Sequence, residues 1–506
     1  MLRRSLRLFS RNWITTTSED LIPSLTTFFS MNPPPKSTLI VTGPQGTGKS
    51  TILQLAFAAG SKSNDPSMFL DVNFAEIVSE PAKEARERNP SEDNTLDPLN
   101  FIDCFNQAVV RGLGHLERKK LLPDTAKQEL VSLFHNYARK LCALSEEVDK
   151  EIAERTDGAN LIELRREEKQ IGIEIINNKL TSYRNVIKLT EVEYSGYQHI
   201  IDNISIVDAF DVVATSILAF RAEHLFGELS SAFLVVVLNT IGKACYEAGI
   251  QAPVLNVSQC QVLCIMEKTI KFFEFLLSEL VNTKTHFYSV LEGHGIYVSP
   301  LSIIEHYSDL FEWCNIKEEN EEWFKAYVTN QVPDITNGEL HDLWHCIYGN
   351  MGLTEVSCRI LKSKNMSVSG IVEWVNNVAL IDLNRTFKSL ETDIETTEEI
   401  GLMDKVMSID RPRVRAACYF LYKLLEEPNY ELEVTIKDLV ENLVIGRLCV
   451  LKILYFNTHT MKIGFDKKVF PSVLPKCDVW KYNETWAERA KNKIAYNKMA
   501  QEKLNY

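Results

Sequence analysis

The sequence has no long apolar run and no cysteine framework. None of its 506 residues form the run of about 18 apolar positions that a membrane-spanning helix needs. The densest apolar segment, 232–238, has the length of a buried core element. The eleven cysteines are scattered without a CxxC pair. This pattern is typical of buried thiols in a reducing compartment and argues against a disulfide framework.

The sequence also lacks an excess of basic residues. Its net charge of −13 argues against generic binding to nucleic acid or to anionic lipid, because both favour a basic surface. A hydrophobic content of 45% and a charged content of 24% are ordinary for a globular protein. The length predicts about two to four domains.

The first seventeen residues differ from the rest, because they are basic and contain no acid. Their arginines are Arg3, Arg4, Arg7 and Arg11. Their apolar residues recur every three or four positions, at Leu2, Leu6, Phe9 and Trp13. The pattern predicts an amphipathic mitochondrial presequence, cleaved after Phe9 by a matrix protease. The alternative is a short exposed helix that stays attached.

A strand–helix–strand pattern follows the presequence. The β-branched run 37–43 predicts a strand, 49–60 has helical periodicity, and 67–74 predicts a second buried strand. Such a βαβ unit begins a parallel α/β sheet. We expect later strands at 252–263 and 285–291, on either side of a helix at 265–283.

The turn between the first strand and its helix matches the pattern GxxxxGK[ST] in full. Its residues are Gly43, Pro44, Gln45, Gly46, Thr47, Gly48, Lys49 and Ser50, followed by Thr51. Glycines let backbone N–H groups converge on a β-phosphate, and the start of the helix adds its positive end. Lys49 would reach the β- and γ-oxygens, and Ser50 would supply an oxygen to Mg²⁺. The motif therefore predicts binding of a nucleoside triphosphate and Mg²⁺.

The order of elements indicates the domains. Residues 100–195 are charged and helical, with a seam of about two heptads at Ile173, Ile176, Leu180, Tyr183 and Ile187. A seam this short favours a helical hairpin over a coiled-coil dimerisation arm. We expect an α/β fold with these parts: a presequence and linker at 1–30, a P-loop nucleotide-binding domain at 31–300 with a helical insertion at about 100–195, a helical lid at 301–405, a winged-helix-like domain at 406–476, and a charged C-terminal helix at 477–506.

This order resembles the STAND/archaeal-type branch of AAA-like P-loop ATPases, which has organellar members. The resemblance implies ATP as the nucleotide, since no base-recognition residue is evident in the sequence. In that branch a later strand ends in an Asp-Glu pair that orders Mg²⁺ and activates water. Here the matching phrase "PVLNVSQCQVL" (253–263) has Ser258 and Gln259 at those two positions.

These two residues predict slow or absent hydrolysis. Serine and glutamine carry neither the negative charge that offsets Mg²⁺ nor the basicity to accept a proton, and losing a catalytic base costs about 10²- to 10⁴-fold in rate. The alternative catalytic acid is Asp208, which ends the apolar run 204–208 and is followed by Asp211. Short apolar runs are ambiguous between strand and helix, so both assignments stay open here.

Two further patterns are weaker. The phrase "HDLWH" places His341 and His345 on one helical face, which resembles a zinc motif, but a packed lid helix is favoured. Cys260 and Cys264 lack a second pair and are expected to be core thiols.

The predicted winged helix has nearly balanced charge, whereas a DNA reader usually presents a basic stripe. We therefore expect a protein partner, bound through the helical insertion, the winged helix or the C-terminal helix; an oligomer is possible. The sequence favours a mitochondrial ATP-binding conformational switch with weak hydrolysis. The alternatives are an active, oligomeric, protein-remodelling ATPase and a nucleic-acid-associated ATPase.

Overall fold

The computed structural model describes residues 13–16, 18–60, 68–73, 98–137, 205–211, 223–260, 267–293, 310–392, 412–434, 445, 448–449, 452–457, 460 and 462–477. Three sequence predictions lie outside these residues: the cleavage site after Phe9, the coiled-coil seam at 173–187, and the C-terminal helix beyond Cys477.

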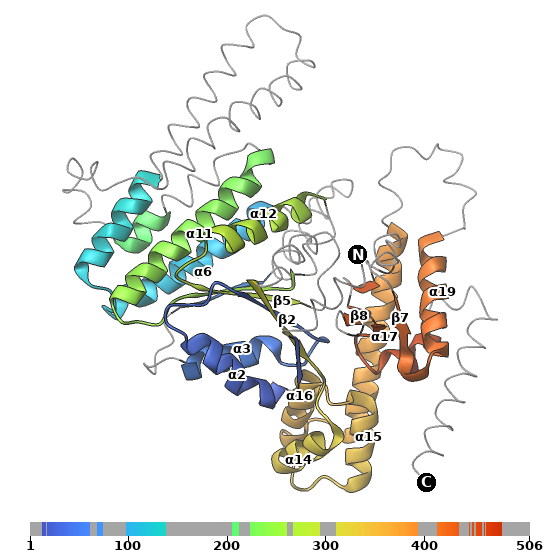
Figure 1. Ribbon diagram of the computed structural model, residues 1–506. Helices are drawn as coiled ribbons and strands as arrows, with labels where there is room; N and C mark the ends of the chain where they lie inside the picture. Colours follow the sequence, from blue (N-terminus) through green and yellow to red (C-terminus); the bar gives the residue numbers. More distant parts are fainter. Residues whose placement is uncertain are drawn as a thin grey trace, which may run out of the picture.

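A six-stranded parallel sheet forms the centre of the molecule (Figure 1). Its strands are β1 (Trp13–Thr16), β2 (Thr38–Thr42), β3 (Phe69–Asn73), β4 (Val254–Ser258), β5 (Tyr288–Gly293) and β6 (Phe311–Ile316). Their order is β1-β6-β2-β5-β4-β3, and every neighbouring pair is parallel. All residues of β2, β4 and β5 are buried, as expected for a parallel sheet with helices on both faces.

Helices α2 (Ser18–Ser30) and α3 (Lys49–Gly60) cover one face of the sheet. Phe29 of α2 makes an edge-to-face contact with Phe57 of α3, and its ring also contacts Tyr288 on β5. The Tyr288 hydroxyl donates a hydrogen bond to the Phe29 carbonyl at 2.8 Å. These contacts fix α3, and therefore the turn that precedes it, against the sheet.

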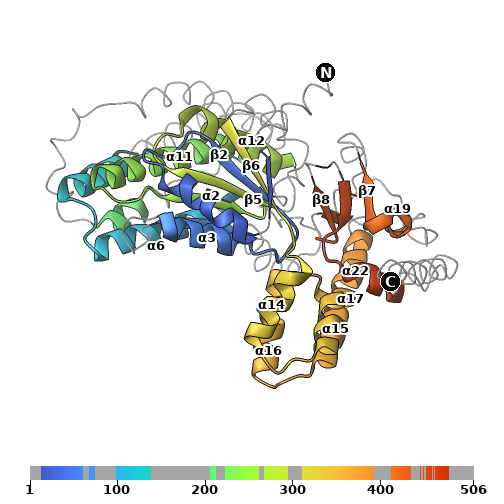
Figure 2. The ribbon, with the colours of Figure 1, turned by 60° about the horizontal axis from the view of Figure 1, so that its bottom comes forward.

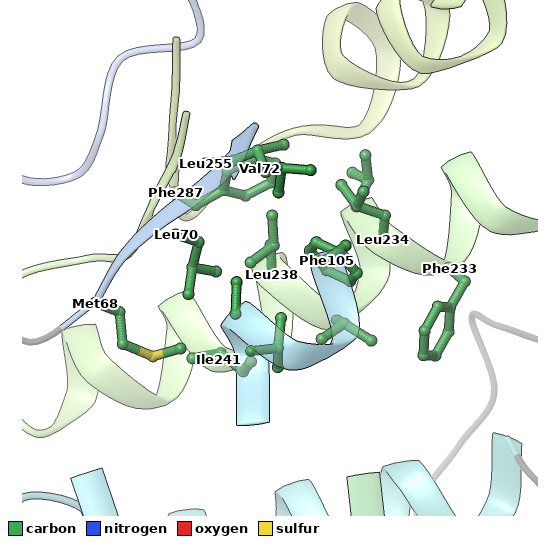
Figure 3. Close-up of a cluster of buried hydrophobic side chains, with 14 of the residues drawn as sticks. Met68, Leu70, Val72, Phe105, Phe233, Leu234, Leu238, Ile241, Leu255 and Phe287 are labelled. Carbon is green, nitrogen blue, oxygen red and sulfur yellow. The ribbon is translucent and has the colours of Figure 1, made fainter. Parts of the chain in front are cut away.

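Helices α6 (Pro98–Arg118), α11 (Glu223–Glu247) and α12 (Glu267–Thr283) cover the opposite face (Figures 1 and 2). Their side chains meet the sheet in one large core, where Phe105 and Leu238 lie close to Leu70 and Leu255 (Figure 3). The expected α/β architecture with a parallel sheet is confirmed.

The structure corrects several predicted boundaries. Trp13 lies in strand β1, which pairs with β6, and helix α2 packs on the main domain, so 13–30 is not a linker. Strand β6 lies within 301–405, which was predicted to be helical throughout. Helix α6 belongs to the layer covering the sheet, so the core of this domain includes part of the predicted insertion.

The remaining helices and strands form a second core. They are α14 (Glu321–Gln331), α15 (Asn337–Ile347), α16 (Met351–Lys362), α17 (Val368–Thr392), α19 (Pro412–Glu426), β7 (Glu431–Glu433), β8 (Leu454–Asn457), β9 (Lys462–Phe465) and α22 (Phe470–Val473). Strands β7, β9 and β8 form a small antiparallel sheet. Side chains on α14–α17 and on the C-terminal elements join one hydrophobic cluster. The division into a lid and a winged-helix-like domain stays a prediction.

Two composition-based expectations hold for the described residues. The cysteines whose side chains are described are buried free thiols: Cys245, Cys260, Cys314, Cys346, Cys358, Cys418, Cys449 and Cys477. None of the described helices is both long and apolar enough to cross a membrane.

Candidate functional site

The turn 43–48 connects β2 to α3 and brings a run of backbone groups to the end of the sheet. Gly46 and Gly48 have φ of 81° and 80°, in the left-handed region that favours glycine. A Cβ atom at Gly43 would lie 2.5 Å from the Ile316 carbonyl oxygen, so this glycine allows the turn to pass close to β6. The conformation therefore depends on the glycines of the motif.

Lys49 begins helix α3 and is almost fully buried. Its Nζ atom donates hydrogen bonds to the carbonyl oxygens of Gly43 at 2.9 Å and Pro44 at 2.8 Å. Burial lowers the pKa of Lys49, while the nearby carboxylates of Glu292 and Asp466 act in the opposite direction. The ammonium group thus folds back over its own turn, next to the place where the motif predicts phosphate oxygens.

Ser50, the predicted Mg²⁺ ligand, lies against a carboxylate that sequence analysis missed. Its Oγ atom donates to the two carboxylate oxygens of Glu292, at 2.8 and 3.0 Å. Glu292 is on β5, opposite Val41 of β2 in the parallel register, and is only 3% exposed. The alternative acid predicted from the sequence was Asp208, and Glu292 was not predicted.

Two more polar side chains extend this contact across the sheet. Asn256 on β4 donates from Nδ2 to Asp71 Oδ1 at 2.9 Å and to Glu292 Oε2 at 3.3 Å. Asp71 lies on β3, directly opposite Asn256 in the register. Asn256 is fully buried, and its Oδ1 atom has no hydrogen-bond partner among the described residues. Strands β3, β4 and β5 therefore each contribute one polar side chain.

Ser258 and Gln259 lie at the end of β4, beside the turn. The Ser258 hydroxyl is buried and donates to the Val72 carbonyl at 3.4 Å, so it points toward β3. Gln259 has a φ of 62° and lines the same cavity as Lys49, Ser50 and Glu292. Of the two predicted catalytic positions, Gln259 faces the candidate site.

Asp208 lies elsewhere. Residues 206–211 form a helix, so the apolar run that was ambiguous between strand and helix is helical. The neighbours Ile206 and Phe210 belong to the core on the α6 and α11 side of the sheet, opposite α3. Asp208 Oδ2 accepts a hydrogen bond from the Ser205 hydroxyl at 2.6 Å, an arrangement typical of a helix start. The structure does not bring Asp208 to the glycine-rich turn.

Helix α16 and the residues before it contact the glycine-rich turn directly. Asn350 donates from Nδ2 to the Gln45 carbonyl at 2.6 Å, and the Gly352 N–H donates to the Gly46 carbonyl at 2.8 Å. Asn350 Oδ1 also caps α16 by accepting from the Leu353 N–H at 3.0 Å. The start of α16 is thereby fixed to the turn.

A cavity of about 350 Å³ lies between the turn and these helices. Its lining residues are Gln45, Gly46, Gly48, Lys49, Ser50, Thr51, Gln259 and Glu292 from the main domain, with Tyr327, Met351, Gly352 and Glu355 from α14 and α16. Its volume lies within the range of small-ligand sites.

The C-terminal sheet also contacts the turn. The Gln45 N–H donates to Asp466 Oδ1 at 3.0 Å, and Asp466 is almost fully buried. Burial raises the pKa of the Asp466 carboxyl to about 6, although the Gln45 N–H and the nearby Lys49 act in the opposite direction. Nearby, the Tyr455 hydroxyl donates to Asn315 Oδ1 at 2.5 Å, which joins β8 to β6.

The weaker patterns give no second site. His341 and His345 lie on α15 with their rings 4.2 Å apart. Among the described residues no group of three or more potential metal ligands comes together. Cys260 is a buried thiol whose Sγ donates to the Val257 carbonyl, and Cys264 lies outside the described residues.

Comparisons with known proteins give little further information. The sequence matches no protein-family model and no curated protein. Among solved structures, the chain is similar to a Walker-type ATPase of Pyrococcus abyssi, with 12% sequence identity and a TM-score of 0.43. That similarity covers 90% of this chain and 95% of the other. It is too distant to carry an argument, so the functional case depends on the residues themselves.

Proposed function

We propose that this chain is a P-loop protein that binds Mg-ATP in the cavity beside Lys49 and acts as a nucleotide-dependent conformational switch. The observation that carries the proposal is that two distant segments contact the backbone of one residue of the turn. Asn350 contacts the Gln45 carbonyl, and Asp466 contacts the Gln45 N–H. Phosphate entering the turn would meet both contacts.

The negative charge of Asp466 indicates which conformational state ATP would favour. The buried Asp466 carboxylate approaches a turn whose motif is built for anions. A triphosphate in that turn would repel Asp466 and compete for Lys49, so ATP binds better to a state in which the C-terminal sheet has moved away. Ligands shift a conformational equilibrium only through such a difference in affinity.

Weak hydrolysis is part of the proposal. Gln259 faces the cavity from the end of β4. Glutamine can contact a water molecule but cannot accept its proton at neutral pH. When bound, Mg²⁺ would offset the phosphate charge, and Ser50 would provide an oxygen contact. We propose a mitochondrial location because the N-terminal segment, residues 1–17, is basic and contains no acid.

Hydrogen exchange of the full chain tests the switch. With saturating Mg-ATP, amide exchange in 452–477 and at the start of α16 should change in the native chain but not in Lys49→Ala. Lys36→Ala changes an exposed lysine just before β2, at the opposite end of that strand from the turn, and is the control. Binding of ATP without any exchange change in these segments would contradict a switch.

The alternative proposal is an active Mg-dependent ATPase, which is oligomeric and remodels proteins. The rate of phosphate release distinguishes this ATPase from the proposed switch, because typical enzymes turn over at about 1–10³ s⁻¹. Turnover in that range, abolished by Lys49→Ala, would favour the ATPase. A nucleic-acid-associated ATPase would need salt-sensitive binding to DNA or RNA, which the net charge of −13 disfavours.

A further inference from the structure

We propose that Glu292 is the carboxylate that orders Mg²⁺ beside Ser50, and that this role has moved from the end of β4 to the end of the neighbouring strand β5. The inference deepens the proposed function and rests on it. It means that the chain keeps the metal-ordering acid while lacking the water-activating acid at Gln259.

The parallel register supports the placement of this acid on β5 in place of β4. Val257 of β4 pairs with Leu291 of β5, so the next residues, Ser258 at the end of β4 and Glu292 one position before the end of β5, lie side by side. Strand β5 lies between β4 and the P-loop strand β2. Glu292 is therefore one strand closer to Ser50 than Ser258 is, and a glutamate there reaches the serine hydroxyl.

The hydrogen bonds show that the P-loop serine contacts the acid on β5. Ser50 donates to both oxygens of Glu292, whereas Ser258 donates to the Val72 carbonyl. In P-loop proteins, the serine of the motif and an acid from a neighbouring strand together hold Mg²⁺. Mg²⁺ keeps several water molecules and takes only one or two carboxylates from the protein, so one buried glutamate suffices.

A second observation indicates a ligand at this place. The fully buried Asn256 amide lies between Asp71 and Glu292, and its Nδ2 atom donates to both carboxylates. The Oδ1 atom of the same amide is a buried acceptor without a hydrogen-bond partner among the described residues. Buried acceptors are seldom left unsatisfied, and a magnesium-bound water is a suitable donor.

A rival explanation is that Glu292 serves only as a counter-ion for Lys49, whose pKa it influences. The two explanations differ in their dependence on metal. A counter-ion changes ATP affinity equally with and without Mg²⁺. A metal-ordering carboxylate instead increases the gain in ATP affinity that Mg²⁺ brings.

The test compares ATP affinity by calorimetry in excess Mg²⁺ and in EDTA, for the full native chain, Glu292→Gln and Glu312→Gln. Glu312 is a matched control, because it accepts a hydrogen bond from the Ser37 hydroxyl at 2.6 Å at the opposite end of the sheet. We expect Glu292→Gln to reduce the Mg²⁺-dependent gain in affinity by about 10- to 100-fold, as for other residues that orient a metal. Glu312→Gln should leave the gain unchanged.

Each outcome is decisive. An equal effect of Glu292→Gln in Mg²⁺ and in EDTA, or no effect, overturns the metal role and leaves the proposed function intact. A native chain that binds ATP in neither solution overturns the proposed function and this inference with it. Glutamine keeps an acceptor for Ser50, and a thermal melt of each ligand-free variant identifies any folding defect.

Discussion

Gln45 and Asp466, which are 421 positions apart in the sequence, are joined by a hydrogen bond of 3.0 Å from the Gln45 N–H to Asp466 Oδ1. The bond links the glycine-rich turn to the loop after β9. It is the most direct contact through which the occupancy of the turn could affect the C-terminal sheet. Asp466 is therefore the first residue to examine outside the motif.

The pH dependence of stability tests the burial of Asp466. Its pKa is raised from 3.8 to about 6 in the folded chain. Between these values the folded chain keeps a proton that the unfolded chain has lost, so the free energy of unfolding falls as pH rises through this window. The fall should be up to about 3 kcal/mol.

Asp466→Asn removes this titration and keeps an acceptor for the Gln45 N–H. The variant should lose the decrease between about pH 4 and pH 6 in urea unfolding. If it follows the native pH profile, Asp466 is not the group responsible.

Asn350 should support the turn in addition to capping its helix. Asn350→Ala and Asn320→Ala each remove a helix N-cap, since Asn320 accepts from the Trp323 N–H at 2.8 Å. Each should lower the free energy of unfolding by about 1 kcal/mol. Because only Asn350 also donates to Gln45, only Asn350→Ala should speed amide exchange at 45–48. Equal exchange in the two variants would mean that the Asn350 contact does not hold the turn.

Restoring acids at the end of β4 should raise hydrolysis. The double change Ser258→Asp and Gln259→Glu supplies a carboxylate beside the cavity that Gln259 lines. Phosphate release should rise by about 10²-fold or more, the usual contribution of a catalytic base. Asp208→Asn is the control, because Asp208 lies on the other side of the sheet. A drop in native phosphate release on Asp208→Asn would contradict the assignment made here.

Asn256 should stabilise the fold by separating two carboxylates. Asn256→Ala removes the donor to Asp71 and Glu292 and should lower the free energy of unfolding by about 1–3 kcal/mol. Urea unfolding of the native chain and the variant measures the loss. Equal stability of the two chains would mean that these hydrogen bonds do not stabilise the fold.

The glycine-rich turn and its flanking elements were predictable because all of their signals are local. The motif 43–50, the β-branched run before it and the helical periodicity after it lie within about 25 residues. The structure confirms β2 at Thr38–Thr42 and α3 at Lys49–Gly60. The end of β4 at Ser258 also falls where the sequence phrase indicated.

The position of Glu292 beside Ser50 was not predictable, because it depends on which strand lies next to β2. Sequence analysis ended that strand at residue 291, one position before the glutamate. The signal was present, since "YSVLEG" is a buried run with an acid one residue before the carboxyl end of a parallel strand. Only the strand order places this end beside Ser50.

Strand β6 and the contact of Asp466 were missed for a similar reason. The segment 311–316 is short and includes Glu312 and Asn315, so it lacks a continuous apolar run. Its place beside β2 comes from tertiary pairing. Asp466 gave no signal either, because an acid after an amphipathic strand is usually solvent-exposed.

Equilibrium binding of Mg-ATP to the native chain, Lys49→Ala and Lys36→Ala is the most direct test of the central claim. The account predicts saturable binding to the native chain and to Lys36→Ala, with binding lost or weakened by at least about tenfold in Lys49→Ala, because the buried ammonium is next to the turn. Equal binding by all three chains, or no binding by the native chain, would contradict it.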